Sequence, residues 1–386
     1  MAREIAVKQP FRSLWMSLLI TFPMALWALL MFSRSFTPGN SNPRRIAAVI
    51  VMCFMVWLFY KMVRTGTTYR WRRYFFVALG FLFPVGFIAA LIAERGSMSI
   101  GMDQMVGGNT PFCNMVIPMI IIPAALTKTI IFPGSIMPTA TNPHSIAVMI
   151  GLWFAATLVL GKAWCAYGCF FGGIEEGFAG VMKRAKLKRI DPRFRYVPWA
   201  VLLFIVLLSA MMFEPIYCDW LCPFKTVTEY ARVHSVETAI QAGIFLSLFF
   251  GLVVALPLLT KRRTQCAFFC PFGAFQSIFD KINIFQIRID REKCKECVIC
   301  RGNCPTMAIN EDSLKHGKML TSCMRCGECV DQCPSGAAVW HIKGTQVNVK
   351  PERARLMFLY ASWALATMFG GSIIAGSLST MLGWVL

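Results

Sequence analysis

The 386-residue chain has room for about two or three soluble domains, but 56% of its residues are hydrophobic, 15% are charged, and the mean hydropathy is +0.57. This composition predicts an integral membrane protein and excludes an ordinary soluble globular protein. The net charge of +20 would suit nucleic acid. However, the Lys and Arg residues stand in clusters between apolar segments, as membrane topology requires, so no nucleic-acid partner is expected.

The N-terminal region, residues 1–145, contains three apolar runs that are each about as long as a membrane-spanning helix. They cover Ser13 to Phe32, Ile46 to Val63 and Tyr74 to Ala93. The first run lacks a clear small-residue cleavage site, so no cleavable signal peptide is expected. Basic residues before the first run and between the second and third place both loops in the cytoplasm. These residues are Arg3, Lys8, Arg12, Arg64, Arg70, Arg72 and Arg73.

A further apolar stretch, Phe112 to Pro133, is interrupted by prolines and carries Lys128 in its middle. Interior prolines remove backbone hydrogen bonds that lipid cannot replace, so a re-entrant or kinked segment is expected in place of a clean span. Such segments line ion or cofactor sites in some transporters, but a lid on the outer face is an equally good interpretation.

The second membrane region, residues 146–263, holds three more spans: Ile146 to Leu160, Val197 to Phe213 and Ala239 to Thr260. A strongly basic loop follows the first of them, and Lys261 to Arg263 follow the last, so both loops should be cytoplasmic. Residues 264–355 are then a cytoplasmic domain, and residues 356–386 supply a seventh span. The basic residues of the long loop are Lys183, Arg184, Lys186, Lys188, Arg189, Arg193 and Arg195.

Eight cysteines of the cytoplasmic domain form two runs with identical spacing, each followed by a proline. This is the signature of bacterial ferredoxins with two [4Fe–4S] clusters, in which the fourth cysteine of each run ligates the cluster of the other run. A zinc ribbon takes its ligands as two separated pairs, and disulfide scaffolds are typical of small secreted domains, so both fit less well. The expected ligands are Cys294, Cys297, Cys300 and Cys333 for the first cluster, and Cys323, Cys326, Cys329 and Cys304 for the second.

Three other pairs of cysteines have Cys-x-x-x-Cys spacing, which places both thiols on one helix face. The first and third pairs follow the inner ends of the fourth and sixth spans, and we expect them to meet as a third iron–sulfur or mononuclear iron centre. The second pair falls in an outer loop, where a metal or redox role competes with a disulfide. The pairs are Cys165 with Cys169, Cys218 with Cys222, and Cys266 with Cys270.

The remaining candidates have plainer interpretations. Lone Cys53 and Cys113 are expected to be ordinary buried thiols. Glu175 and Glu176 could relay a proton from a quinol headgroup, but solvated interfacial carboxylates are commoner. Haem is not expected, because the histidines do not face each other within the bundle. The histidines are His144, His234, His316 and His341.

Within residues 146 to 345, four segments together resemble the membrane polyferredoxins of the NapH and NosR type: GKAWCAYGCFFG, CAFFCPFGAFQSIFDK, CKECVICRGNCP and CMRCGECVDQCP. The resemblance implies several transmembrane helices, Cys-x-x-x-Cys-Pro motifs near the cytoplasmic face and a double [4Fe–4S] unit. Members pass electrons between the quinone pool or cytosolic donors and periplasmic systems. Phe170 stands where the family tends to have proline, the segment CDWLCPFK is an additional motif relative to NapH, and the flavin attachment site of NosR-like relatives is not visible.

The sequence therefore predicts a mainly α protein, a polytopic membrane helix bundle of about seven spans with an inserted two-cluster bacterial ferredoxin-like α+β domain. We expect it in the cell (inner) membrane, with the ferredoxin domain on the cytoplasmic side. The expected function is electron transfer between these clusters and the quinone pool or a partner redox subunit: a cytochrome, flavoprotein or quinone-linked enzyme. A metal-reducing or assembly factor for a respiratory metalloenzyme and an ion-translocating redox subunit are the alternatives. No catalytic residue is assigned, and a quinone is a further candidate cofactor.

Overall fold

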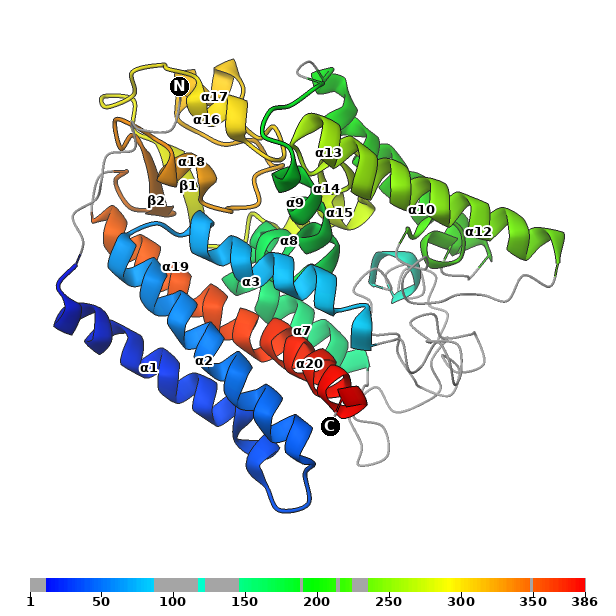
Figure 1. Ribbon diagram of the computed structural model, residues 1–386. Coiled ribbons are helices and arrows are strands. Elements are labelled where there is room, and N and C mark those ends of the chain that lie inside the picture. Colours follow the sequence, from blue (N-terminus) through cyan, green and yellow to red (C-terminus); the bar gives the residue numbers. More distant parts are fainter. Residues whose placement is uncertain are drawn as a thin grey trace.

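The computed structural model describes residues 12–86, 117–121, 146–187, 190–212, 216–223, 235–347 and 350–385. Within these residues, a bundle of long apolar helices lies below a small cysteine-rich domain that carries a two-stranded sheet (Figure 1). The expectation of a mainly α membrane protein with a ferredoxin-like domain is confirmed.

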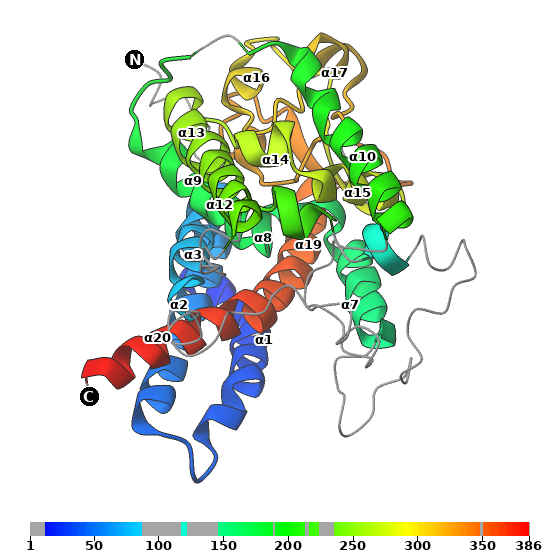
Figure 2. The same ribbon diagram turned by 90° about the vertical axis from the view of Figure 1, so that its right-hand side faces the viewer.

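Seven helical elements of the two chain ends form one bundle. The N-terminal elements are α1 (Leu14–Phe32), η1 (Ser33–Phe36), α2 (Asn42–Thr65) and α3 (Tyr69–Leu82), and the C-terminal ones are α19 (Pro351–Ala366), η7 (Thr367–Gly371) and α20 (Ser372–Val385). Helix α2 packs against both α1 and α20: it lies between them in Figure 1, and α20 crosses in front of it in Figure 2. The fully buried Trp363 packs on Phe75 and donates its indole N–H to the Met55 carbonyl at 3.1 Å. This contact joins α2, α3 and α19 in one core.

The middle of the chain adds shorter helices beside this bundle. They are η2 (Ile117–Ile121), α7 (Ile146–Val159), η3 (Gly161–Ala163), α8 (Trp164–Tyr167), α9 (Phe170–Val181), η4 (Pro192–Tyr196), α10 (Val197–Met212), η5 (Tyr217–Leu221), α12 (Val236–Leu248), η6 (Phe249–Ala255), α13 (Leu256–Thr260), α14 (Thr264–Phe268) and α15 (Pro271–Phe279). The chain bends by 102° between Ile150–Val159 and Gly161–Tyr167. Gly161 sits at this bend with a left-handed backbone (φ 54°), which favours glycine.

Five helices of the described residues are long and apolar enough to cross a membrane, and the bent pair at Gly161 would make a sixth span. The five are Leu14–Phe36, Asn42–Thr65, Pro192–Met212, Val236–Thr260 and Pro351–Val385. Each coincides with an expected span, and the bent pair coincides with the fourth. The end of the expected span Tyr74 to Ala93 lies outside the described residues, as does most of Phe112 to Pro133.

The cysteine-rich domain is built on strands β1 (Phe285–Ile289) and β2 (Ala338–Ile342), with helices α16 (Ile299–Asn303), α17 (Glu311–His316) and α18 (Glu328–Asp331). The strands pair antiparallel, with Phe285 opposite Ile342. Side chains of β1 alternate between buried and half-buried, as expected for a strand with one face on a core.

Two contacts dock this domain onto the bundle. The ring of Phe358 in α19 is fully buried and stacks on Trp340 of β2, with the ring centroids 4.5 Å apart. The carboxylate of Asp331 accepts the backbone N–H groups of Thr68 and Tyr69, at 3.1 and 2.7 Å, and so caps the start of α3. The cysteine domain therefore lies directly against the first turn of a bundle helix.

Candidate iron–sulfur centres

The first four-cysteine set lines a small cavity on the solvent-exposed side of the cysteine domain. Its thiols come from three cysteines of the first run and from the last cysteine of the second run: Cys294, Cys297, Cys300 and Cys333. Cys297 is exposed and the other three are half-buried. The exposed side chains of Val298 and Ile299 stand beside it. The structure thus brings together the set expected for the first cluster, close to solvent.

The second set lines a separate cavity on the side of the bundle: Cys304, Cys323, Cys326 and Cys329. Cys326 and Cys329 are buried. Burial raises the pKa of the Cys304 thiol to about 11 and that of Cys326 further above its ordinary range. Thiols with raised pKa values would stay protonated on their own, and bound iron offsets the charge of their thiolates. The donor chemistry of both cavities therefore fits an iron–sulfur cluster.

The two runs fold alike, residue for residue. Glu296 and Arg325, at the same position of each run, have left-handed backbones with φ of 50° and 49°. The next such pair is Val298 and Gly327, with φ of 52° and 88°. Beyond the fourth cysteine, the Cys304 sulfur accepts the N–H of Ala308 and the Cys333 sulfur that of Ala337, each at 3.2 Å. These repeated turns direct the thiols of each run toward a common cavity.

The first and third Cys-x-x-x-Cys pairs also share one local structure. Cys165 lies in the short helix α8, and Cys169 is the N-cap of α9. In the same way Cys266 lies in α14, and Cys270 is the N-cap of α15. The backbone N–H of the second cysteine donates to a carbonyl five residues back in both pairs, at 3.1 and 2.8 Å.

The four thiols of these two pairs lie close enough to influence one another. Burial, and after it the nearby Cys165 and Cys169 thiols, raise the pKa of Cys270 above its ordinary range. In the described part of the chain, however, no three His, Cys, Asp or Glu side chains are arranged to hold a single metal ion. A lone tetrahedral ion with bonds near ~2.3 Å needs tightly gathered sulfurs. The absence of such an arrangement also holds for the two sets that line the cavities, so all three cysteine sets are alike in this respect among the described residues.

Arg263 connects this set with the second cavity. Its guanidinium is buried and donates to the Cys165 carbonyl at 2.5 Å and to the Cys266 sulfur at 3.2 Å. It also donates to the sulfur of Met324 at 2.7 Å, and Met324 stands between two cysteines of the second run. Sequence reasoning placed Arg263 only in a basic loop that ends a span. Its spacing, three residues before Cys266, was the available signal.

Glu175 and Glu176 are buried, so the interpretation as solvated interfacial carboxylates is wrong. Glu175 accepts the backbone N–H of Gln265 at 2.5 Å, and burial raises the pKa of its carboxyl to about 7. Glu176 forms an ion pair with the buried Arg72 at 2.6 Å. Arg263 lies 3.8 Å from Glu175 and 3.9 Å from Glu176. The carboxylates are buried because two arginines compensate their charge.

A second group of contacts holds the loop of Cys323 to Cys326 against the membrane-side helices. Arg325 forms an ion pair with Asp280 at 2.6 Å and donates to the Leu160 carbonyl at 2.9 Å. Ser277 donates to the Thr321 carbonyl at 3.2 Å. The second run is therefore fixed in place between α7 and α15.

The other cysteines are placed as follows. Cys222 is partly buried and packs against the same apolar cluster as Phe269 and Phe272, which flank Cys270. The side chain of its partner Cys218 lies outside the described residues, as does Cys113. Cys53 is exposed on α2, so the expectation of a buried thiol there is wrong. Position 53 is on the lipid-facing side of a span, where a small apolar thiol needs no core.

Two sequence families match the chain. The model of the family described as "4Fe-4S dicluster domain" matches residues 286–351, and that of the "4Fe-4S binding domain" matches residues 141–189, 196–236 and 242–291. The first match covers both cysteine runs. Each segment of the second match contains one Cys-x-x-x-Cys pair. The expectation of iron–sulfur cofactors is confirmed.

Known relatives agree with this. The chain is 25% identical to YccM of Escherichia coli over 243 residues, which are 60% of the chain and 64% of YccM. It is 25% identical to the ferredoxin-type protein NapH of Escherichia coli over 200 residues, 50% of the chain and 66% of NapH. It is 26% identical to the regulatory protein NosR of Pseudomonas aeruginosa over 188 residues, 47% of the chain and 26% of NosR. The chain is a relative of NapH and NosR.

The resemblance drawn from the cysteine motifs is thus confirmed, and it extends to two families of iron–sulfur domain. The matches span less than two thirds of YccM, NapH and NosR. No solved structure shows significant similarity to the chain. The three consecutive matches to one binding-domain model indicate an internal repeat in this NapH and NosR relative, which sequence reasoning missed. In each repeat an apolar segment accompanies a cysteine pair.

Proposed function

We propose that the chain is a membrane electron-transfer protein that carries electrons between its ferredoxin-like cysteine domain and a redox partner in the membrane. Iron–sulfur clusters bound in its cysteine sites supply one-electron carriers. The proposed ligand sets are those lining the two cavities, with Cys333 joining the first run and Cys304 the second.

One observation carries this proposal. The second cysteine cavity and the paired cysteines at the membrane side share a single buried side chain, Arg263, which contacts Met324 on one side and Cys266 on the other. The backbone of the Cys165 to Cys169 segment also contacts Arg263. Arg263 therefore places the second cavity and the paired cysteines next to each other. The arrangement supports a third cluster held by Cys165, Cys169, Cys266 and Cys270.

The placement of the three sets suggests an order. The first cavity has an exposed cysteine, the second is buried at the bundle, and the third set lies beyond Arg263. We propose that a soluble donor or acceptor meets the first site on the cytoplasmic side. At the other end, the exchange partner is the quinone pool or a partner redox subunit. The similarity to the ferredoxin-type proteins NapH and MauN supports the electron-transfer role.

Anaerobic purification with iron and sulfide counting tests the proposal. Three [4Fe–4S] clusters require about twelve irons per chain, whereas the ferredoxin unit alone requires about eight. Cys165→Ala and Cys266→Ala should each lower the count by about four and leave the ferredoxin signals in the EPR spectrum unchanged. Cys53→Ala, on the lipid side, is the matched control. A wild-type chain with no acid-labile sulfide would refute the proposal.

A second candidate function rests on the remaining cysteine pair. The segment 196–236, which contains Cys218 and Cys222, matches the same binding-domain model as the two other pairs. A pair that binds or reduces a metal ion would suit a metal-reducing or assembly factor. Stoichiometric copper binding by the purified protein, lost in Cys222→Ser, would favour this role, and electron transfer without copper binding would favour the first proposal.

A further inference from the structure

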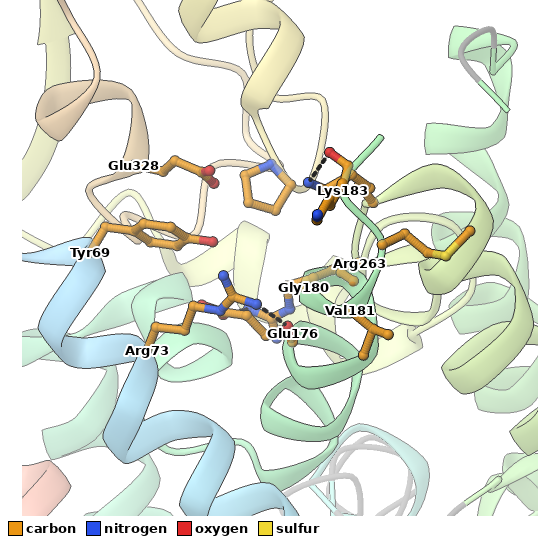
Figure 3. Close-up of a pocket in the computed structure, with 12 residues that line it drawn as sticks. Tyr69, Arg73, Glu176, Gly180, Val181, Lys183, Arg263 and Glu328 are labelled. Carbon is orange, nitrogen blue, oxygen red and sulfur yellow. Dashed lines mark hydrogen bonds and ion pairs between the residues drawn. The ribbon is translucent and has the colours of Figure 1, made fainter. Parts of the chain in front are cut away.

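A cavity of about 490 Å³ lies at the junction of the cysteine domain and the membrane-side helices (Figure 3). On the side of the helices, its walls come from α3, the end of α9 with the following loop, and the loop after α13. The cysteine domain contributes Pro305 and Glu328. None of the three cysteine sets lines this cavity, so it is separate from the proposed cluster sites.

Four cationic side chains line the cavity: Arg73, Lys183, Lys261 and Arg263. In Figure 3, Arg73 enters from below and Lys183 lies at the upper right, on opposite sides of the open space. Arg73 donates to the backbone carbonyl of Glu176 at 3.2 Å, and Lys261 to that of Lys183 at 3.3 Å. These acceptors are neutral. Within the described residues, no carboxylate forms an ion pair with Arg73, Lys183 or Lys261.

The two acidic side chains of the cavity do not balance these charges. Glu176 is already paired with Arg72 at 2.6 Å, and the charge of Arg263 is shared with Glu175 and Glu176. Glu328 points into the cavity beside the Tyr69 hydroxyl, across the open space from Lys183 (Figure 3). Three cations and one carboxylate therefore remain facing the open space, and the site has an excess of positive charge.

The sequence also indicates where the cavity lies relative to the apolar layer of the membrane. Lys261 is the first residue after the span Val236–Thr260, so it marks the point where that helix leaves the apolar layer. Val181, another lining residue, is 68% exposed and lies beside the same opening. Cationic side chains at the end of a span lie at the level of lipid headgroups.

We propose that this cavity binds a phosphate group, carried by an anionic phospholipid headgroup or by free phosphate. The guanidinium of Arg73 offers two N–H donors to phosphate oxygens, and Lys183 and Lys261 supply two ammonium groups from the opposite wall. A phosphodiester headgroup fits the position at the end of a span, with its acyl chains outside the cavity.

Gly180 makes the position of Arg73 possible. A Cβ atom added at Gly180 would lie only 1.4 Å from the Nη2 atom of Arg73. The guanidinium is the far end of a flexible side chain and can swing away, so Gly180→Ala should leave the fold intact while removing Arg73 from the cavity. Alanine is also the better helix former.

The experiment compares two probes on the full chain, purified without oxygen in a neutral detergent. Native mass spectrometry measures retention of phosphatidylglycerol against phosphatidylcholine, and calorimetry measures binding of inorganic phosphate. The test variants are Arg73→Gln combined with Lys261→Gln, and Gly180→Ala. The control is Arg70→Gln combined with Lys186→Gln, which removes two exposed charges that lie outside the cavity, one from α3 and one from the loop after α9.

We expect wild type and control to retain phosphatidylglycerol selectively, and each test variant to bind it at least ~10-fold more weakly, because charge-assisted hydrogen bonds are lost. Selective binding of inorganic phosphate, lost in the same variants, would identify free phosphate as the source. Unchanged iron and sulfide content shows that a variant is folded, and Gly180→Ala decides the case if the double variant fails this check. Binding that persists at wild-type strength in Gly180→Ala, or wild type that binds neither probe, would overturn the proposal.

Discussion

Left-handed backbone positions reveal how each cysteine run is shaped. Val298 has φ of 52°, although a β-branched residue is strongly disfavoured there, and the equivalent position in the second run is Gly327. Strain of this kind persists where the surrounding structure requires it, typically at binding sites. The turn after the second cysteine is thus demanded by the cavity and is not a consequence of local sequence preference.

Relief of this strain is measurable. Val298→Gly should be more stable than Val298→Ala by roughly 1 kcal/mol, because glycine accepts a positive φ and alanine retains the Cβ penalty. Val298 is 48% exposed, so both variants lose similar amounts of buried surface. Thermal unfolding of the cluster-loaded protein, followed by loss of visible absorbance, gives the comparison. A more stable alanine variant would show that position 298 is not strained.

Crossed ligation makes a second residue-level prediction. Cys304→Ser should damage the cluster of the second cavity, and Cys333→Ser that of the first, although each residue belongs to the opposite run. EPR spectra of the two reduced variants distinguish the outcomes, because each should lose a different signal. If Cys304→Ser removed the first-cavity signal alone, the ligation would follow the runs without crossing.

The third residue-level prediction concerns Arg263. Arg263→Met removes the only cation that contacts both Glu175 and the Cys266 sulfur among the described residues, and leaves a buried carboxylate uncompensated. Loss of a buried charge partner costs roughly 3–5 kcal/mol. Iron should therefore be lost first from the paired-cysteine set, by about four atoms per chain. Arg263→Lys keeps the charge, so its iron loss should be smaller. Equal iron content in all three proteins would contradict this role.

The sequence predicted how the cysteines are grouped, but it did not predict which other side chains contact them. The spacing of the cysteine runs predicted which four side chains share each cavity, because the turn geometry repeats with the spacing. Arg263 and Met324 could not be predicted in this way, since their contact joins residues 61 positions apart. Glu175 and Glu176 were misjudged for the same reason. Their burial depends on Arg72 and Arg263, which arrive from other helices.

At the scale of elements, α3 and α9 pack with unusually close backbones. A Cβ at Gly173 would lie 2.1 Å from the carbonyl oxygen of Phe76, and a Cβ at Gly80 would lie 2.4 Å from the backbone N of Ile174. Neither contact can be relieved by a side-chain rotation, because the opposing atoms are backbone. This close approach brings Arg72 to Glu176 and so positions the charged groups beside the third cysteine set.

Gly173→Ala tests this packing. The added methyl group must push α9 away from α3, so we expect destabilisation of at least ~1–3 kcal/mol, as for overpacked cores. Gly243→Ala in α12 is the control, because a Cβ there meets nothing within 4 Å. The measurements are the thermal midpoint in detergent and the iron content. Equal thermal midpoints for the two variants would mean that α3 and α9 can move apart without loss of stability.

Hydropathy predicted most of the long helices, since apolar length is read directly from the chain. It did not predict the short helices α8 and α14, whose residues carry no strong periodicity. Each of these helices is followed by a cysteine at the N-cap of the next helix, and this arrangement depends on buried contacts such as that of Gln265 with Glu175. The repeat in sequence was the signal that would have shown α8 and α14 to be equivalent.

At the scale of the whole molecule, the cysteine sites run from a solvent-exposed face toward the bundle. The two chain ends meet at α19. Trp27 of α1 donates its indole N–H to the Ala364 carbonyl of α19 at 3.1 Å, and Phe358 of α19 packs against Trp340 of the sheet. The cysteine domain is therefore attached, through α19, to the helices of the bundle.

The last span and the basic loops together lead to a prediction about orientation. Because Pro351–Val385 is a single apolar element after the cysteine domain, the two ends of this element must lie on opposite sides of the membrane. The three basic loops predict that the cysteine domain is cytoplasmic, so the C-terminus should be outside. Fusions of alkaline phosphatase and of a fluorescent protein after Gln346 and after Leu386 test this. Phosphatase should be active only in the longer fusion, and fluorescence should appear only in the shorter one. The reverse pattern would place the iron–sulfur domain on the outer side and would require an extracytoplasmic electron donor.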